Sequence, residues 1–158
     1  MTPAHQFDVP PKRSYAIGEY SVDWSDFLAN YWTAGQAYGL GNRVRSRLVK
    51  GLEWEATTAG ASGTREPRWP TTVGATVSDG SIVWTCRASS NASLRTTIAT
   101  STWSADTGVT LSNDTTDGAA AMVYVGGGTD GQSYQVRNRV TFADGTRDEA
   151  ELTIAVAD

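Results

Sequence analysis

The sequence contains very little of the chemistry on which most catalytic and metal sites depend. Among 158 residues it has a single histidine, His5, and a single cysteine, Cys86. One histidine excludes a multi-histidine zinc site and argues against a histidine-based catalytic triad, and one cysteine excludes an intrachain disulfide. We therefore expect a protein that is not an enzyme, with no catalytic residues, no metal ligands and no cofactor.

Long apolar stretches and an excess of positive charge are also missing. The apolar stretches are only a few residues long, far short of the about 20 residues that span a membrane. The N-terminus has neither the basic region nor the apolar stretch of a signal peptide. A net charge of −4 and a pI near 4.9 argue against general binding to nucleic-acid phosphates. We expect neither nucleic acid nor a membrane as a partner.

The residues that are abundant favour an all-β fold. Leu, Ile, Val and Phe total only 27, whereas Thr (21), Ala (20), Gly (16) and Ser (14) dominate the chain. Six Trp, six Tyr and three Phe argue against disorder, because disordered chains contain few aromatic residues. Small β-formers, turn residues and a few large aromatic anchors are typical of compact β-modules with modest cores.

Alternation of apolar and polar residues predicts a series of short strands. Tyr20, Val22 and Trp24 follow one another at period two, and Ser25 is a plausible N-cap for a short helical turn at 25–28. The later segments that alternate, and are expected to be strands, are 43–45, 47–49, 52–57, 81–86, 96–103, 107–111, 121–125, 133–141 and 150–156. The spacing of the last five indicates an immunoglobulin-like sandwich, and the strands between residues 35 and 90 indicate a small β-meander.

Two segments that contain glycine and aspartate resemble a dinucleotide-binding motif and a calcium-binding loop, but the residues around them do not support either site. Gly126–Gly131 has the G-x-G-x-x-G spacing, but the alternating residues 132–136 that follow predict a strand rather than the helix that a dinucleotide site needs. Asn113–Gly118 offers oxygen ligands but lacks the closing Glu of a calcium loop. We interpret both as turns between strands.

Four tryptophans lie on the apolar face of strands in which apolar and polar residues alternate, so we expect them in hydrophobic cores. Trp54 and Trp84 belong to the meander, and Trp24 and Trp103 to the sandwich. Cys86 lies two residues after Trp84 in the same strand, so we expect a small buried thiol rather than a nucleophile.

Trp69 differs from these because it lies in an irregular loop between two prolines. Arg65 and Arg68 lie beside it in the sequence. An exposed indole next to guanidinium groups could stack on a sugar or anchor a protein interface, where Trp and Arg are enriched. Trp69, Arg65 and Arg68 are therefore the candidate interface or glycan contacts. The alternative is that Trp69 folds back to cap a meander too small to have a large core.

The meander carries the first resemblance to known proteins. Its tryptophans, glycines and prolines occur in three runs: 54–63 (WEATTAGASG), 66–70 (EPRWP) and 77–84 (VSDGSIVW). Over Gly35–Arg87, this pattern is similar to small carbohydrate-binding-like β-modules of phage tail proteins and tail fibres.

A second resemblance comes from the segments on either side of the meander. The runs that carry it are 20–28 (YSVDWSDFL), 97–103 (TIATSTW), 125–134 (VGGGTDGQSY) and 136–141 (VRNRVT). They resemble parts of one β-sandwich in phage fibre-tail adaptor proteins. Residues 147–151 (RDEAE) depart from the family, in which a more basic, Ser-containing stretch is expected.

The second resemblance also implies a domain arrangement. In the family, the Asp-Trp-Ser strand runs almost directly into the Ile-Ala-x-Ser-Thr-Trp strand, whereas more than sixty residues intervene here. The implied domains are a discontinuous sandwich at 15–30 plus 93–158 and an inserted module at 35–90. Before them, Pro3, Pro10 and Pro11 predict that residues 1–14 are an extended arm that packs only against something else.

The implied function is that of a structural virion protein of a tailed phage. It would attach tail fibres or spikes to the tail or connector and would lie in the tail or at the head–tail junction. Its expected partners are the tail fibre and portal, connector or nozzle proteins, with multiple copies around a ring and a glycan as a further candidate ligand. The alternatives are a capsid decoration protein or a glycan-binding module of the virion.

Overall fold

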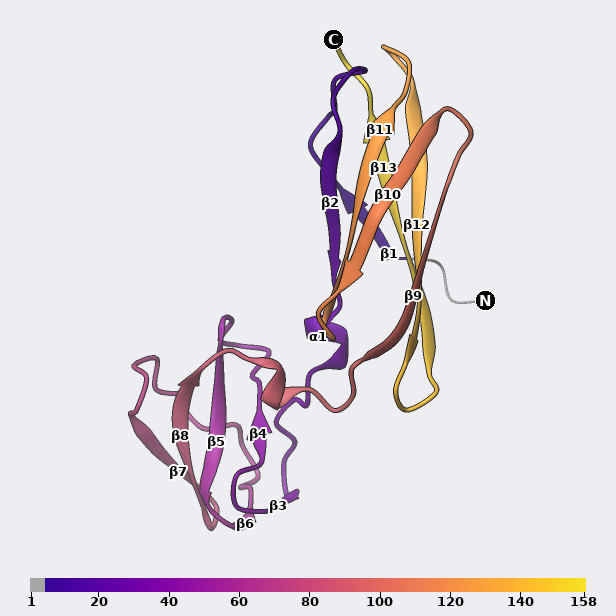
Figure 1. Ribbon diagram of the computed structural model, residues 1–158. Helices are drawn as coiled ribbons and strands as arrows, with labels where there is room; N and C mark the ends of the chain where they lie inside the picture. The colour runs from indigo at the N-terminus through magenta and orange to yellow at the C-terminus, as the bar shows by residue number, and fades with distance from the viewer. Residues whose placement is uncertain (1–4) are drawn as a thin grey trace. The chain divides into compact units, whose positions relative to one another are not determined.

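The computed structural model describes residues 5–158, and this part of the chain is almost entirely β-structure (Figure 1). It divides into two compact units. The sandwich unit contains the residues up to Asp26 together with Thr96–Asp158, and the small unit contains Phe27–Arg95. The all-β class expected from composition is confirmed.

Two sheets form the sandwich unit. The first has the strand order β1-β13-β12-β9 and the second has the order β10-β11-β2. Apart from the parallel pair β1 and β13, neighbouring strands in both sheets are antiparallel. The strands of this unit are β1 (His5–Asp8), β2 (Gly18–Asp23), β9 (Ile98–Ala105), β10 (Val109–Thr116), β11 (Ala120–Gly127), β12 (Ser133–Phe142) and β13 (Arg147–Ala155).

The core of the sandwich unit follows from the period-two alternation of its strands. Buried side chains alternate with more exposed ones along β12 and β13, so that one face of each strand points inward. Trp24 is buried where it follows β2, and its ring meets Phe142 of β12 edge to face at 5.9 Å. The Trp24 indole N–H donates to the side-chain oxygen of fully buried Asn138 at 3.0 Å. These contacts join the two sheets.

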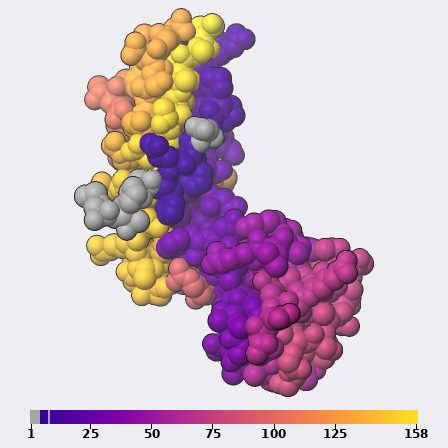
Figure 2. All heavy atoms as spheres, turned by 180° about the vertical axis from the view of Figure 1, so that it is seen from behind, coloured from indigo at the N-terminus to yellow at the C-terminus, as the bar shows by residue number. Residues whose placement is uncertain are grey.

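The N-terminal segment does not match the expectation of an arm that packs only against something else. Strand β1 pairs in parallel with β13, with His5 opposite Ala150, and the Lys12 amide donates to the carbonyl of Ala155 at 2.8 Å. Figure 2 shows the indigo segment lying beside the yellow C-terminal residues. The physical reason is that the free edge of β13 offers unpaired backbone groups that an extended segment can satisfy. Residues 1–4 of the expected arm lie outside the described residues.

The small unit is built on a four-stranded antiparallel sheet with the order β4-β5-β8-β7 and a two-stranded ladder of β3 and β6. A single helical turn, α1 (Ser25–Leu28), begins at the boundary between the units, where the sequence predicts one. The other elements are β3 (Ala37–Tyr38), β4 (Arg43–Val44), β5 (Leu52–Thr58), β6 (Gly60–Ala61), β7 (Thr76–Asp79), β8 (Ile82–Ala88) and the 3-10 turn η1 (Asn91–Ser93).

Two local predictions are wrong, and in both cases side-chain or bulge geometry explains why. Residues 47–49 form a bend rather than a strand, because the Ser46 hydroxyl accepts hydrogen bonds from the amides of Leu48 and Val49. Residues 113–116 continue β10 rather than forming a turn. The register shifts there and Asn113 adopts a φ of +50°, a bulge that absorbs extra residues without ending the strand.

Candidate functional site

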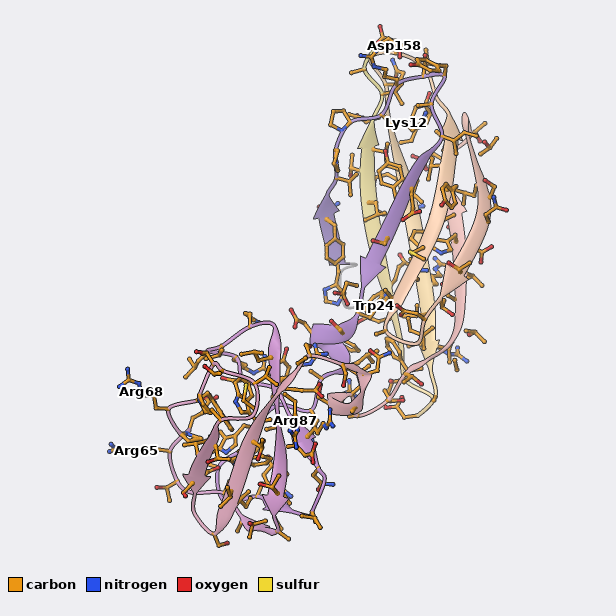
Figure 3. All side chains as sticks on the ribbon, turned by 60° about the vertical axis from the view of Figure 1, so that its left-hand side comes forward. Lys12, Trp24, Arg65, Arg68, Arg87 and Asp158 are labelled. Atoms are coloured by element: carbon orange, nitrogen blue, oxygen red, sulfur yellow. The ribbon has the colours of Figure 1, made fainter. Side chains whose placement is uncertain are left out.

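The loop between β6 and β7 separates the three residues that the sequence groups together. Arg65 and Arg68 are exposed, and Figure 3 shows both side chains projecting from the small unit into solvent. Trp69 instead turns inward and is only 6% exposed. The loop therefore displays two cations on its surface and holds its indole inside.

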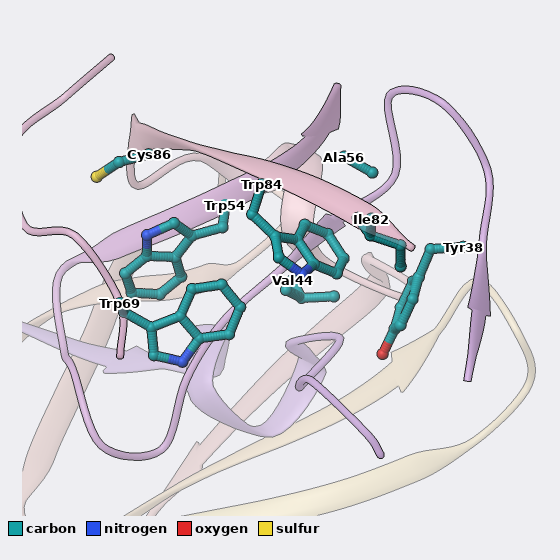
Figure 4. Packing of buried hydrophobic residues seen from close by; sticks show 8 residues of the cluster. All are labelled: Tyr38, Val44, Trp54, Ala56, Trp69, Ile82, Trp84 and Cys86. Atoms are coloured by element: carbon teal, nitrogen blue, oxygen red, sulfur yellow. The ribbon is translucent and has the colours of Figure 1, made fainter. Parts of the chain in front are cut away.

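Trp69 belongs to an aromatic cluster at the centre of the small unit (Figure 4). Its ring centroid lies 4.5 Å from that of Trp54 and 5.9 Å from that of Trp84. Its indole N–H donates to the carboxylate of Glu66 at 2.7 Å. Because the ring packs against other aromatic rings, it is not presented for stacking on a sugar, and this placement corresponds to the alternative in which Trp69 folds back onto the meander.

Asp79 ties the loop to the aromatic cluster. One of its carboxylate oxygens accepts from the indole N–H groups of Trp32 at 2.7 Å and Trp84 at 2.9 Å. Its other oxygen accepts from the backbone amide of Gly63 at 2.8 Å. Asp79 is itself buried, so its charge is stabilised by these three donors rather than by water.

A network of four charged residues crosses β4, β5 and β8. Arg43 bonds the carboxylates of Glu53 at 2.5 Å and Glu55 at 2.8 Å, and Arg87 bonds Glu55 at 3.2 Å. Burial by itself would raise the pKa of Glu53, but hydrogen bonds from Arg43 and Ser90 outweigh it and lower the pKa below its ordinary value. The hydrogen bond from Arg87 lowers the pKa of Glu55. The carboxylates are thus held ionised and paired, which is a structural rather than a catalytic arrangement.

Cys86 is a buried thiol, as expected, and burial raises its pKa. Among residues 5–158, no three His, Cys, Asp or Glu side chains come together in a way that could hold a metal ion. No helix within the same residues is long and apolar enough to cross a membrane.

The sandwich unit contains a cavity that the sequence does not reveal. Its volume is about 290 Å³, and it opens between the edge strands β9 and β10. Its lining residues are Ser101, Thr102, Trp103, Leu111, Ser112, Asp114 and Val123. Trp103, expected simply as a core anchor, is only partly buried, and its buried indole nitrogen has no hydrogen-bond partner within residues 5–158. The available sequence signal is the absence of charge throughout 98–105, which is unusual for a strand at the edge of a sheet.

The similarity to known proteins covers most of the sandwich unit and the end of the small unit. Residues 81–155 match the family described as Podophage GP4 fiber-tail adaptor protein gp77. This match places the protein in the tail of a phage virion. No curated protein and no solved structure matches the chain.

The matched residues cover just under half of the chain and include some of the candidate site residues but not others. They begin at the start of β8 and include all of β9–β13, and therefore every lining residue of the cavity. Trp69, Arg65 and Arg68 lie outside them, as does the run 20–28. The resemblance to fibre-tail adaptors is confirmed for 81–155, whereas the resemblance of 35–87 to carbohydrate-binding-like modules stays a prediction.

Proposed function

We propose that this protein is a non-enzymatic adaptor that attaches tail fibres or spikes to the tail of a phage virion. The observation that carries this proposal is the match of residues 81–155 to the fibre-tail adaptor family. A fibre-tail adaptor interacts with other tail proteins, among them the tail fibre. Portal, connector or nozzle proteins are the proposed partners on the other side of the joint.

The folded surfaces of the chain suit such a joint. The sandwich unit has sheet edges that can pair with strands of neighbouring proteins, and backbone pairing gives affinity without demanding a particular side-chain sequence. Copies arranged around a ring would act together, so that individually weak contacts give a stable attachment. The four charged residues that cross β4, β5 and β8 in the small unit are paired with one another, in keeping with a protein that supports rather than catalyses.

The domain assignment that accompanies this proposal has three parts. We propose that 15–30 plus 93–158 form an immunoglobulin-like sandwich and that 35–90 are a carbohydrate-binding-like module inserted into it. The division of the chain at Asp26 and Thr96 supports a discontinuous domain interrupted by a second one.

Deletion of the gene from the phage, with complementation in trans, tests the attachment role. Particles made without the protein should have tails but no fibres, and supplying the full chain should restore both fibres and adsorption to the host. Electron microscopy of purified particles measures fibre occupancy directly. Particles that keep their fibres without this protein would refute the attachment role.

Arg65 and Arg68 are proposed contacts on the small unit, with buried Trp69 supporting the loop that presents them. Exposed guanidinium groups can bind carboxylates of a neighbouring protein or hydroxyl-rich and acidic groups of a glycan. Replacing both arginines by alanine should lower fibre occupancy or binding to host polysaccharide without changing the urea midpoint of the protein. Unchanged fibre occupancy and unchanged polysaccharide binding would remove these residues from the site.

A further inference from the structure

The sandwich unit has four edge strands, and three of them carry features that discourage the addition of another strand. Edges are normally protected by short length, charge, proline or a bulge, because an exposed ladder of N–H and C=O groups recruits other chains. Strand β1 has only four residues, and prolines follow it. Strand β2 carries Glu19 and Asp23 along its length. Strand β10 contains the bulge at Asn113 and the charge of Asp114.

The fourth edge, β9, has almost none of these protections. It is eight residues long and contains no charged residue and no proline. Its one irregularity lies at its start, opposite Thr141 and Phe142, and from Ser101 to Ala105 it is in regular register with β12. Within residues 5–158 no strand pairs with its other side. Every second residue of such an edge turns its backbone N–H and C=O away from the sheet and towards solvent.

The cavity lies along this same edge. Figure 1 shows β9 and β10 leaving one shared turn and diverging, which separates the edges of the two sheets. The inward-facing residues Ser101 and Trp103 of β9, with Leu111 and Val123 from the other sheet, line the opening. The indole N–H of Trp103 is itself shielded from this opening and has no acceptor within residues 5–158. A buried donor of this kind is destabilising unless something accepts its hydrogen bond.

We propose that β9 and the adjoining cavity bind an extended segment of a partner tail protein, which adds to the sheet as a strand beside β9. The segment pairs with the free backbone groups of β9, and one of its alternate side chains enters the cavity. The identity of the partner as a tail protein depends on the proposed function, whereas the position of the binding edge does not.

The residues that line the cavity limit which side chains of the bound segment can enter it. Among the residues that the structure describes, Asp114 is the single ionisable side chain in the lining, so the inserted residues are neutral or basic rather than acidic. The remaining lining groups are three hydroxyls and the apolar surfaces of Trp103, Leu111 and Val123, which suit Ser, Thr, Asn, Gln or Val at the inserted position. The segment must be free of proline at the positions that pair with β9, because each pairing residue needs its own N–H.

Hydrogen–deuterium exchange of the full chain, free and in purified virions, tests the position of the edge. Amides of 98–105 that face away from β12 should exchange at least ten times more slowly in the virion than in the free protein. Equal exchange of this segment in the two states would overturn the proposal. If slow exchange of β9 also appears when the free protein alone is concentrated, the occupant is a second copy of this chain, and the proposal of a different tail protein is overturned.

Competition between wild-type and variant chains tests the uncharged edge of β9 and the adjoining cavity separately. Cells infected with a deletion phage would express wild-type and variant chains together, and mass spectrometry of purified particles would give their ratio. Ser104→Lys places a charge on the exposed face of β9, and Ser21→Lys is the matched control on exposed Ser21 of β2. We expect Ser104→Lys to be depleted in particles and Ser21→Lys to be present at parity. Parity for Ser104→Lys would overturn the proposal.

Trp103→Phe keeps an aromatic ring but removes part of the indole surface that lines the cavity. Incorporation into particles should fall, because less of the cavity wall contacts the inserted side chain. The Tm of the free protein should stay the same or rise, because an unsatisfied buried N–H is removed as well. Unchanged incorporation would overturn the role of the cavity. If the free protein binds host polysaccharide and Trp103→Phe abolishes that binding, the cavity is a glycan site instead.

These results remain distinguishable from a failure of the proposed function. If particles lacking the protein keep their fibres, the attachment role fails, yet slow exchange of β9 in the virion would still establish that a virion partner covers this edge. If fibres are lost without the protein but β9 exchanges equally in both states, the attachment role stands and the strand-binding edge is refuted.

Discussion

Replacing Trp69 by alanine should unfold the small unit while leaving the sandwich unit folded. The Trp69 ring is 6% exposed and packs against Trp54 and Trp84, at the centre of a cluster that holds the sheet of β4, β5, β7 and β8 together. Truncation would remove this packing and leave Glu66 without its indole donor. The two units are compact separately, so the loss should be confined to one of them.

The size of this effect can be worked out from the buried surface. A tryptophan buries about 150–250 Å², which at about 25 cal/mol per Å² corresponds to about 4–6 kcal/mol. Substitutions of buried tryptophan by alanine cost about 3–5 kcal/mol. A unit of about 70 residues has a total stability of about 3–10 kcal/mol, so the substitution removes a large share or all of it.

Urea unfolding followed by tryptophan fluorescence suits this test, because four of the six tryptophans lie in the small unit. Trp69→Phe keeps the ring packing and loses the 2.7 Å hydrogen bond to Glu66, so it should cost only about 1–2 kcal/mol. Arg68→Ala, one residue away on the exposed side of the loop, should leave the midpoint unchanged. A wild-type midpoint for Trp69→Ala would refute the role of Trp69 in the core and return its ring to the candidate glycan contacts.

Two further predictions concern the small unit. The pKa of Glu53 is lowered in the folded state, so its stabilising contribution is present above the ordinary glutamate pKa of about 4.3 and is lost as the pH falls through the folded-state value. Urea midpoints measured from pH 7 to pH 3 should therefore fall for the wild type, and the fall should be shallower for Glu53→Gln; equal slopes would contradict this account. Gly80→Ala should cost more than about 1 kcal/mol, because Gly80 has a φ of +60° and a Cβ there would lie 2.3 Å from the carbonyl oxygen of Ala61. Gly74→Ala, at a φ of +91° with open space around it, provides the matched control, and equal losses at the two positions in thermal unfolding would show that backbone strain alone matters.

The β9 edge with its cavity and the loop with Arg65 and Arg68 differ in how freely their amino-acid sequences can change. The residues matched to the fibre-tail adaptor family contain the cavity and the unprotected strand β9, whereas the exposed arginines belong to the loop outside them. An edge that binds through backbone groups tolerates change in most of its side chains, provided that it stays uncharged and keeps its inward-facing residues. Surface arginines have no such constraint from the fold.

Period-two alternation and turn residues determined most of the secondary structure from the sequence alone. Strands and the helical turn at 25–28 could be predicted because each depends on residues close together in the chain. The bend at 47–49 could not be predicted, because the Ser46 hydroxyl competes with strand pairing in a way that alternation does not encode. The burial of Cys86 and of Trp54 and Trp84 followed from strand phase.

The tertiary structure decided the features that depend on residues far apart in the sequence. Trp69 lies in an irregular loop without a period, so only the position of Trp54 and Trp84 in space shows that its ring is inside. The pairing of β1 with β13 joins residues more than 140 positions apart, and no local pattern specifies it. The cavity beside Trp103 is likewise visible only in three dimensions. Strand phase turns Trp103 inward, but the cavity that its side chain lines depends on the second sheet, whose edge diverges from β9.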